Sequence, residues 1–204
     1  MSKYSKIFSH LYDPVMGVLE NKILKEKRKF LLQEVKPPVL EIGAGTGANL
    51  CFYNFSPDFD LTIIEKSPYM VEQIKKKFPD KIDKIQFIVD SIENKHLISQ
   101  LPRFNTIVST LTLCSVGNLE LVIEHLKQLL HNNGKLLVIE HIRSNHRFYG
   151  TFQDVIYPAW KIIGDGCHIN RKIDVALKKE FYPIYEEYFF AGVDFYLAKM
   201  RKSN

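Results

Sequence analysis

The chain has 204 residues, of which 46% are hydrophobic, 25% charged and 12% aromatic. This balance excludes a disordered chain and suits one α/β domain over residues 1–204. The formal net charge of +5 is mild, so it favours an anionic partner or surface only weakly.

Residues 1–36 are predicted to form a helical lid over a pocket. Apolar side chains recur there at helical spacing, with Ile23, Phe30 and Leu31 on one face, and Pro14 divides the segment into two helices. The second helix is basic, which predicts a solvated face; a peripheral contact with anionic lipid is the alternative. The basic residues are Lys22, Lys25, Lys27, Arg28 and Lys29.

Strand and helix patterns alternate from residue 39 onward. Short apolar runs predict five strands, and amphipathic stretches between them predict helices. The alternation predicts an α/β fold with a Rossmann-like, doubly wound, mostly parallel sheet. The predicted strands cover residues 39–42, 61–64, 85–89, 104–108 and 135–140. The predicted helices cover about 46–53, 68–78, 119–132 and 148–161.

Local signals set several element ends. Ser67 and Asn118 are predicted to cap the helices that follow them, and Asn133-Gly134 to stop the second of these. Residues 181–199 hold two aromatic-rich runs that meet near Ala191-Gly192. They predict an antiparallel hairpin at the carboxyl-terminal edge of the sheet.

Cysteine usage and hydropathy bear on the compartment. Cys51, Cys114 and Cys167 are odd in number and far apart, which predicts reduced thiols in a cytosolic protein. The first residues lack the apolar run of a secretion signal, and no stretch reaches the ~18 apolar residues of a transmembrane helix. We therefore expect a cytoplasmic protein, with peripheral membrane contact as the alternative.

A glycine-rich turn joins the first predicted strand to the segment after it. It reads Glu41-Ile42-Gly43-Ala44-Gly45-Thr46-Gly47. In open α/β sheets, ligands bind at the carboxyl ends of the strands. Glycines let a ligand approach the backbone there, and a helix start presents free N–H groups to a carboxylate or phosphate.

Acidic residues end the next two predicted strands. Glu65 lies about 20 residues beyond the turn, where a carboxylate can accept hydrogen bonds from both hydroxyls of a ribose. Asp90 is placed to accept an adenine amino group, and Met70, Ile92 and Leu111 to pack on the adenine faces. The turn and the acids together predict a nucleoside-binding pocket.

The same turn resembles the cofactor motif of class I S-adenosylmethionine-dependent methyltransferases. The wider pattern resembles the ubiquinone and phospholipid methyltransferase group. A closer similarity is to the methyltransferase-like protein seven family of thiol S-methyltransferases and its bacterial relatives, over about residues 39–175. Three stretches carry it: Gly45 to Tyr53, Thr110 to Val116, and Glu140-His141 with Trp160 and Gly164-Asp165-Gly166-Cys167.

The resemblance implies an S-adenosylmethionine pocket. It implies cofactor contacts from Glu41, Gly43, Gly45, Gly47, Glu65, Met70, Asp90, Ile92 and Leu111. The turn also fits the dinucleotide pattern G-x-G-x-x-A through Ala48, so a NAD-dependent oxidoreductase is an alternative. The position of Glu41 before the glycines and the predicted hairpin favour the methyltransferase, although neither decides alone.

The acceptor side is less defined. Methyl transfer mainly needs positioning, and a thiol acceptor must lose its proton. His141 is the first candidate for a base or polarising group, with a bond to nearby backbone as an equal alternative. Asp165 and His168 are second candidates for orienting the acceptor; a simple capped turn is the alternative for Asp165. Cys167 is expected to be a packed thiol.

Aromatic residues complete the predicted pocket, and no metal is expected. Tyr12 and Tyr157 are candidates for lining the acceptor site, because aromatic faces attract a sulfonium. Trp160 is a third candidate, although core packing is the stronger expectation for it. The irregular spacing of His141, Cys167 and His168 argues against zinc.

These observations predict a small-molecule methyltransferase whose acceptor is a thiol or another soft nucleophile. Its alternative acceptor is a phospholipid amine or a quinone-type carbon, which the basic helix favours. A non-catalytic cofactor-binding protein is a further alternative. Nucleic acid is disfavoured, because the basic residues are not interleaved with aromatic ones.

Overall fold

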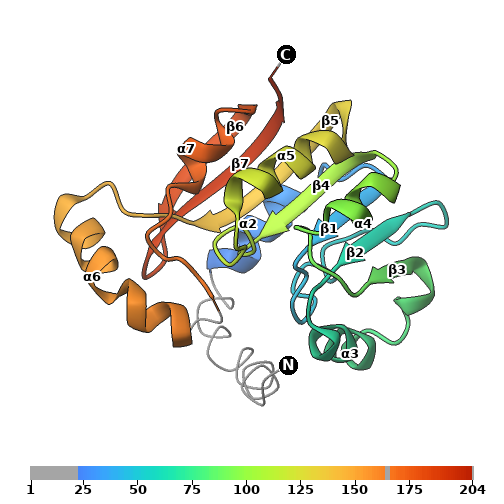
Figure 1. The fold of residues 1–204 in the computed structure, drawn as a ribbon. Coiled ribbons are helices and arrows are strands. Elements are labelled where there is room, and N and C mark those ends of the chain that lie inside the picture. Colours follow the sequence, from blue (N-terminus) through green and yellow to red (C-terminus); the bar gives the residue numbers. More distant parts are fainter. Residues whose placement is uncertain (1–22, 164–165, 204) are drawn as a thin grey trace.

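The computed structural model describes residues 23–163 and 166–203, arranged around one seven-stranded sheet (Figure 1). Its strand order is β3-β2-β1-β4-β5-β7-β6. Neighbours among β1 to β5 pair in parallel, whereas β7 pairs antiparallel with both β5 and β6. The predicted fold class, including the antiparallel hairpin, is confirmed. The strands are β1 Val39–Ile42, β2 Leu61–Ile64, β3 Ile85–Ile88, β4 Phe104–Thr110, β5 Leu130–His141, β6 Phe181–Phe190 and β7 Asp194–Lys202.

Helices cover both faces of the sheet. One apolar cluster packs α4, α5 and α7 on one face, and a second packs α2 and α3 on the other. Leu136 and Leu137 of β5 enter opposite clusters, as the alternation of side chains along a strand requires. The helices are α2 Lys25–Leu32, α3 Pro68–Lys77, α4 Lys95–Gln100, α5 Leu119–Leu129, α6 Arg147–Ile163 and α7 Ile173–Leu177, with a 3₁₀ turn at Ile82–Lys84. Figure 1 shows α6 standing out to one side of the sheet.

The predicted caps are present, but one predicted helix end is wrong. Ser67 accepts the Met70 N–H at the start of α3, and Asn118 accepts the Leu121 N–H at the start of α5. However, α5 ends at Leu129 rather than at Asn133-Gly134. The fully buried Leu130 already pairs with β4, and an irregular register follows it, so tertiary pairing overrides the local stop signal.

The helix predicted over residues 46–53 is also wrong, because this segment forms successive turns. Amides of Gly47, Leu50 and Phe52 each donate to the carbonyl three residues earlier. Gly45 and Gly47 have φ values of 56° and 84°, which a right-handed helix does not allow. The glycines that open the pocket therefore also prevent a regular helix directly after it.

The helix α2 turns a different face to the core from the predicted one. Leu24, Leu31 and Leu32 are buried, whereas Ile23 and Phe30 are exposed. The remaining predictions for the amino-terminal lid fall outside the described residues. Across the residues that the structure describes, no helix combines the length and apolar character needed to span a membrane.

Candidate active site

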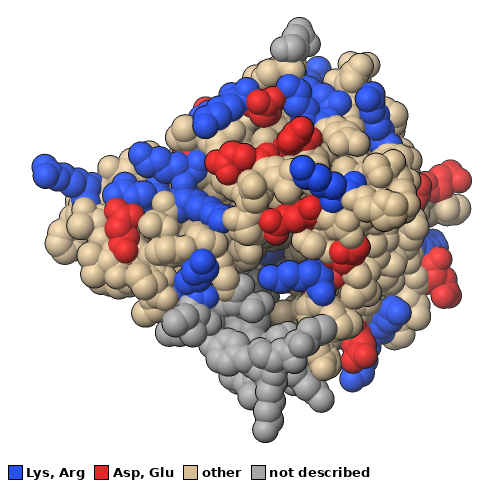
Figure 2. Space-filling view, in the orientation of Figure 1, with Lys and Arg blue, Asp and Glu red and all other residues tan. Residues whose placement is uncertain are grey.

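The strand order reverses beside β1, which has β2 on one side and β4 on the other. Such a switch point is where open α/β sheets bind ligands. The glycine turn follows β1 at this point. In the orientation of Figure 1, the space-filling view is hollowed near the middle, where the central strands end (Figure 2). The candidate site is built around this edge.

Two glycines shape the turn in different ways. A Cβ on Gly43 would lie 2.4 Å from side-chain atoms of Thr112, because the segment after β4 packs directly on the turn. Thr112 Oγ1 lies 3.1 Å from the carbonyl oxygens of both Ile42 and Gly43. At Gly45 a Cβ would meet no atom of the described residues within 4 Å. Among these residues the backbone at Gly45 thus faces open space, which fits the close approach of a bound nucleoside cofactor.

Glu65 lies at the end of β2 and bonds to the turn. Its side chain is buried, its Oε2 accepts the Gly45 N–H at 3.0 Å, and its Oε1 accepts the Ser67 N–H at 2.9 Å. A carboxylate is an acceptor with several lone pairs, which is the chemistry that a ribose diol requires. Glu65 therefore fixes the turn, and its predicted contact with a ribose stays a prediction.

Glu41 lies beneath the turn in a buried polar network. Its Oε1 accepts from Asn49 Nδ2 at 2.9 Å and its Oε2 from the Tyr53 hydroxyl at 2.8 Å. Burial raises the pKa of Glu41, although the bonds from Tyr53 and Asn49 and the charge of Arg28 oppose this. The Glu41 carboxylate is therefore bonded to side chains of the segment that follows it in the sequence. Its predicted contact with a ligand stays a prediction.

Arg28 ties α2 to this network, a role that the sequence analysis missed. Its Nη1 donates to Asn49 Oδ1 and to Thr110 Oγ1, both at 2.7 Å. Arg28 is only 3% exposed, so it does not belong to a solvated or lipid-facing basic surface. The spacing could have indicated this burial. Leu24 lies four residues before Arg28 and Leu31 three residues after it, so all three share one helix face.

The predicted adenine end follows β3 and β4. Asp90 accepts from the Ser91 N–H at 2.6 Å and from Asn94 Nδ2 at 2.8 Å. Met70 and Ile92 are buried. Leu111, directly after β4, has a φ of 57°, which is rare for a leucine and typical of functional sites. Their predicted contacts with adenine remain predictions.

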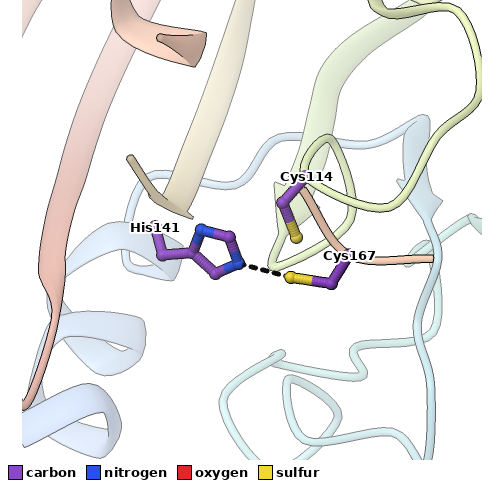
Figure 3. Close-up of side chains that lie close together, drawn as sticks. All are labelled: Cys114, His141 and Cys167. Atoms are coloured by element: carbon purple, nitrogen blue, oxygen red, sulfur yellow. Dashed lines mark hydrogen bonds between the residues drawn. The ribbon is translucent and has the colours of Figure 1, made fainter. Parts of the chain in front are cut away.

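On the acceptor side, His141 meets two cysteines (Figure 3). His141 ends β5, and its Nε2 lies 2.8 Å from Cys167 Sγ. Cys114, after β4, completes the group, and the three donor atoms lie within 4.8 Å of one another. The hydrogen bond with Cys114, followed by burial, raises the pKa of Cys167. Cys167 is therefore a side-chain partner of His141, and the imidazole tautomer decides which of the two atoms donates.

Glu140 positions the loop that holds Cys114. This carboxylate is fully buried, and its Oε1 accepts from Ser109 Oγ and from the N–H groups of Thr112 and Leu113. Burial raises the pKa of Glu140, although these three bonds oppose it. The sequence analysis assigned Glu140 no role, yet an acid inside an apolar strand is itself a signal of a buried polar contact.

Other predicted residues lie along the segment after α6 or on α6 itself. The His168 N–H donates to the Cys114 carbonyl at 2.8 Å, and the His168 ring lies 5.2 Å from that of Tyr157. Trp160 is 42% exposed, so the expectation that it packs in the core is wrong. Asp165 and Tyr12 lie outside the described residues.

A family model described as a methyltransferase domain matches residues 40–136, which run from β1 into β5. The chain is an S-adenosylmethionine-dependent methyltransferase. Its cofactor is S-adenosylmethionine, which the open backbone at Gly45 and the carboxylate of Glu65 fit.

Relatives of this methyltransferase extend the match. The human thiol S-methyltransferase TMT1A is 29% identical over 175 residues, which are 84% of this chain and 70% of the relative. The thiol S-methyltransferase TMT1B of Rattus norvegicus is 30% identical over 74% of this chain and 65% of its own length. The N-methyltransferase NodS from Bradyrhizobium japonicum, solved with S-adenosyl-L-homocysteine, aligns with a TM-score of 0.64 at 17% identity, covering 88% and 87% of the two chains. The last likeness concerns the fold alone.

Proposed function

We propose that this methyltransferase transfers the methyl group of S-adenosylmethionine to the sulfur of a small thiol. The observation that carries the proposal is the similarity to thiol S-methyltransferases over 84% of the chain, which reaches beyond the cofactor half. The sulfur of Cys114 and the imidazole of His141, near the ends of β4 and β5, are soft and polarisable groups, which supports a soft acceptor.

The chain's own residues would position the reactants. When bound, the cofactor supplies an electrophilic methyl group. Glu65 and the glycine turn would orient it, so that an acceptor thiolate attacks the methyl carbon in line. The new C–S bond forms as the old one breaks, and the electron pair of the old bond stays on the cofactor's sulfur. The proton of the acceptor passes to water or to His141, for which the imidazole must first part from Cys167.

A matched acceptor panel tests this proposal. Purified protein and labelled S-adenosylmethionine are incubated with alkyl thiols and with the corresponding alcohols and amines, and the products are identified by mass spectrometry. Methyl sulfides should form, and their rate should rise with pH until the acceptor thiol is ionised, because the thiolate is the nucleophile. Methylated amines or alcohols without methyl sulfides would overturn the thiol assignment.

A lipid-like acceptor is the second candidate, and α6 favours it. Phe148, Phe152 and Val155 recur at helical spacing and are each more than half exposed. Arg147 and Lys161 lie toward the two ends of the same helix. Exposed aromatic and aliphatic side chains flanked by cations suit the surface of an anionic bilayer. A phospholipid amine or a quinone-type carbon would then be the acceptor.

Vesicle flotation separates the two candidates. The lipid candidate predicts that the protein floats with phosphatidylserine vesicles and that Phe152→Ser weakens this severalfold. Tyr182→Ser on β6, a similarly exposed aromatic position away from α6, should leave flotation unchanged. Flotation together with methylated phosphatidylethanolamine would support the lipid acceptor, whereas protein that stays with the aqueous fraction would remove it.

A further inference from the structure

Three chain segments bring together the side chains of Cys114, His141 and Cys167. Cys114 follows β4, His141 ends β5, and Cys167 follows α6. Their donor atoms all lie within 4.8 Å of one another, and Figure 3 shows the imidazole and both sulfurs facing a common point. We propose that these residues form a binding site for a thiophilic divalent cation, with Zn²⁺ as the ion to test.

The spacing of the donors suits such an ion. Zinc binds sulfur at about 2.3 Å and histidine nitrogen at about 2.0–2.1 Å, so tetrahedral ligands lie roughly 3.4–3.8 Å apart. The Nε2–Sγ distance of 2.8 Å is shorter than this, and the upper limit of 4.8 Å for the group is longer. Side-chain shifts of about 1 Å would open the thiol–imidazole contact around the ion. Three protein ligands leave a fourth position for water or another sulfur.

The charge of the site also fits. With both thiols deprotonated and the imidazole neutral, the ligands carry two negative charges, which a divalent cation cancels. Cys114 is 2% exposed and Cys167 is 9% exposed, so the ion would be largely buried. A buried charge is tolerated when it is neutralised by its own ligands. The donors are nitrogen and sulfur, which favours zinc over magnesium or calcium.

The loops that carry the two cysteines are fixed to each other. His168 N–H donates to the Cys114 carbonyl, while Arg171 Nη1 donates to the carbonyls of Leu113 and Val116 at 3.0 and 2.6 Å. These bonds join the two loops directly, through atoms that are not among the proposed ligands. The donor set is therefore held in place by the fold, which lowers the entropic cost of assembling the site.

One atom limits the expected affinity. His141 Nδ1 is buried and has no hydrogen-bond partner among the described residues. Metal-bound histidines usually donate from the second ring nitrogen, and losing that partner costs about 10–100-fold in affinity. We therefore expect weaker binding than at a closed structural zinc site. The argument from sequence spacing against zinc concerned His141, Cys167 and His168, whereas the cluster in the structure has Cys114 in place of His168.

Titration of the reduced, chelator-treated full-length protein tests the site. Co²⁺ reports thiolate ligation by charge-transfer absorption, and Zn²⁺ should then displace it. We expect one ion per chain in the wild type and in Cys51→Ser, whose cysteine is exposed and outside the cluster. Cys114→Ser, Cys167→Ser and His141→Asn should each weaken binding by at least about 100-fold, the upper end of the loss for outer-shell partners.

Circular dichroism and stabilisation by S-adenosyl-L-homocysteine show which variants are folded, and Cys167→Ser alone suffices if Cys114→Ser does not fold. Three outcomes would overturn the proposal. These are no charge-transfer band in the reduced wild type, binding that survives in the folded cluster variants, or a Cys114–Cys167 disulfide whose reduction yields no metal binding. Because metal binding needs no acceptor, failure here leaves the thiol proposal intact.

Discussion

The predicted cofactor side and the predicted acceptor side of the candidate site, both at the carboxyl ends of the parallel strands, carry different kinds of side chain. At the ends of β1 and β2, carboxylates accept hydrogen bonds from backbone amides and polar side chains, as Glu65 does from Gly45. At the end of β5, the His141 imidazole faces two cysteine sulfurs. The first side can bind polar hydroxyls strongly, whereas the second offers polarisable sulfur and imidazole groups. The two sides should therefore respond differently to mutation.

Removing Glu65 should produce the largest effect, and only on the cofactor side. Glu65→Ala removes the acceptor of the Gly45 N–H and two possible charge-assisted bonds to a ribose, worth about 1.5–3 kcal/mol each. Affinity for S-adenosyl-L-homocysteine in calorimetry should fall by about 100-fold or more. Glu72→Ala, an exposed acid on α3, is the matched control. Unchanged affinity in Glu65→Ala would remove this residue from the site.

The two glycines of the turn should separate stability from binding. Both have positive φ, so alanine costs about 1 kcal/mol at either position from backbone strain. Gly43→Ala also forces a methyl group against Thr112, and we expect a total loss of about 2–4 kcal/mol in the free energy of unfolding. Gly45→Ala should lose only the roughly 1 kcal/mol that comes from backbone strain. It should also lower the affinity for the cofactor, because its methyl group enters the space beside the turn. Denaturant unfolding measures the stability of each variant, and calorimetry measures its affinity for the cofactor. Equal unfolding free energies for the two variants would contradict the packing argument.

An ion-pair network far from the thiols should give the smallest effect. Hydrogen bonds from Lys135 and Lys199 lower the pKa of Glu34 to about 2. A lowered folded pKa means that this stability is present above the unfolded value of about 4.3 and is lost progressively as pH falls from about 5 to about 1, through the folded pKa. Glu34 is partly exposed, so Glu34→Gln should cost no more than about 1 kcal/mol at pH 7, and this cost should shrink as pH falls toward 2. Unfolding curves across pH check this, with Glu26→Gln on the preceding helix α2 as the control; a pH-independent cost would contradict it.

The same division explains what could be predicted from the sequence. The cofactor side comes from consecutive strand–turn units, so Gly43, Gly45 and Glu65 stand at spacings that a single chain reveals. The acceptor side joins Cys114 to Cys167 across more than fifty residues, and only the folded chain brings them together. Short-range signals also failed where long-range pairing dominated, as at Leu130.

Arg28 links α2 to the turn through Asn49 and Thr110. Because α2 follows the amino-terminal segment, any partner that holds or displaces this helix would alter the affinity of the turn for its cofactor. Thermodynamic reciprocity then requires the cofactor to change the docking of α2 by the same factor. Slower amide exchange in α2 on addition of S-adenosyl-L-homocysteine would make the amino-terminal helix an allosteric element rather than a passive cover.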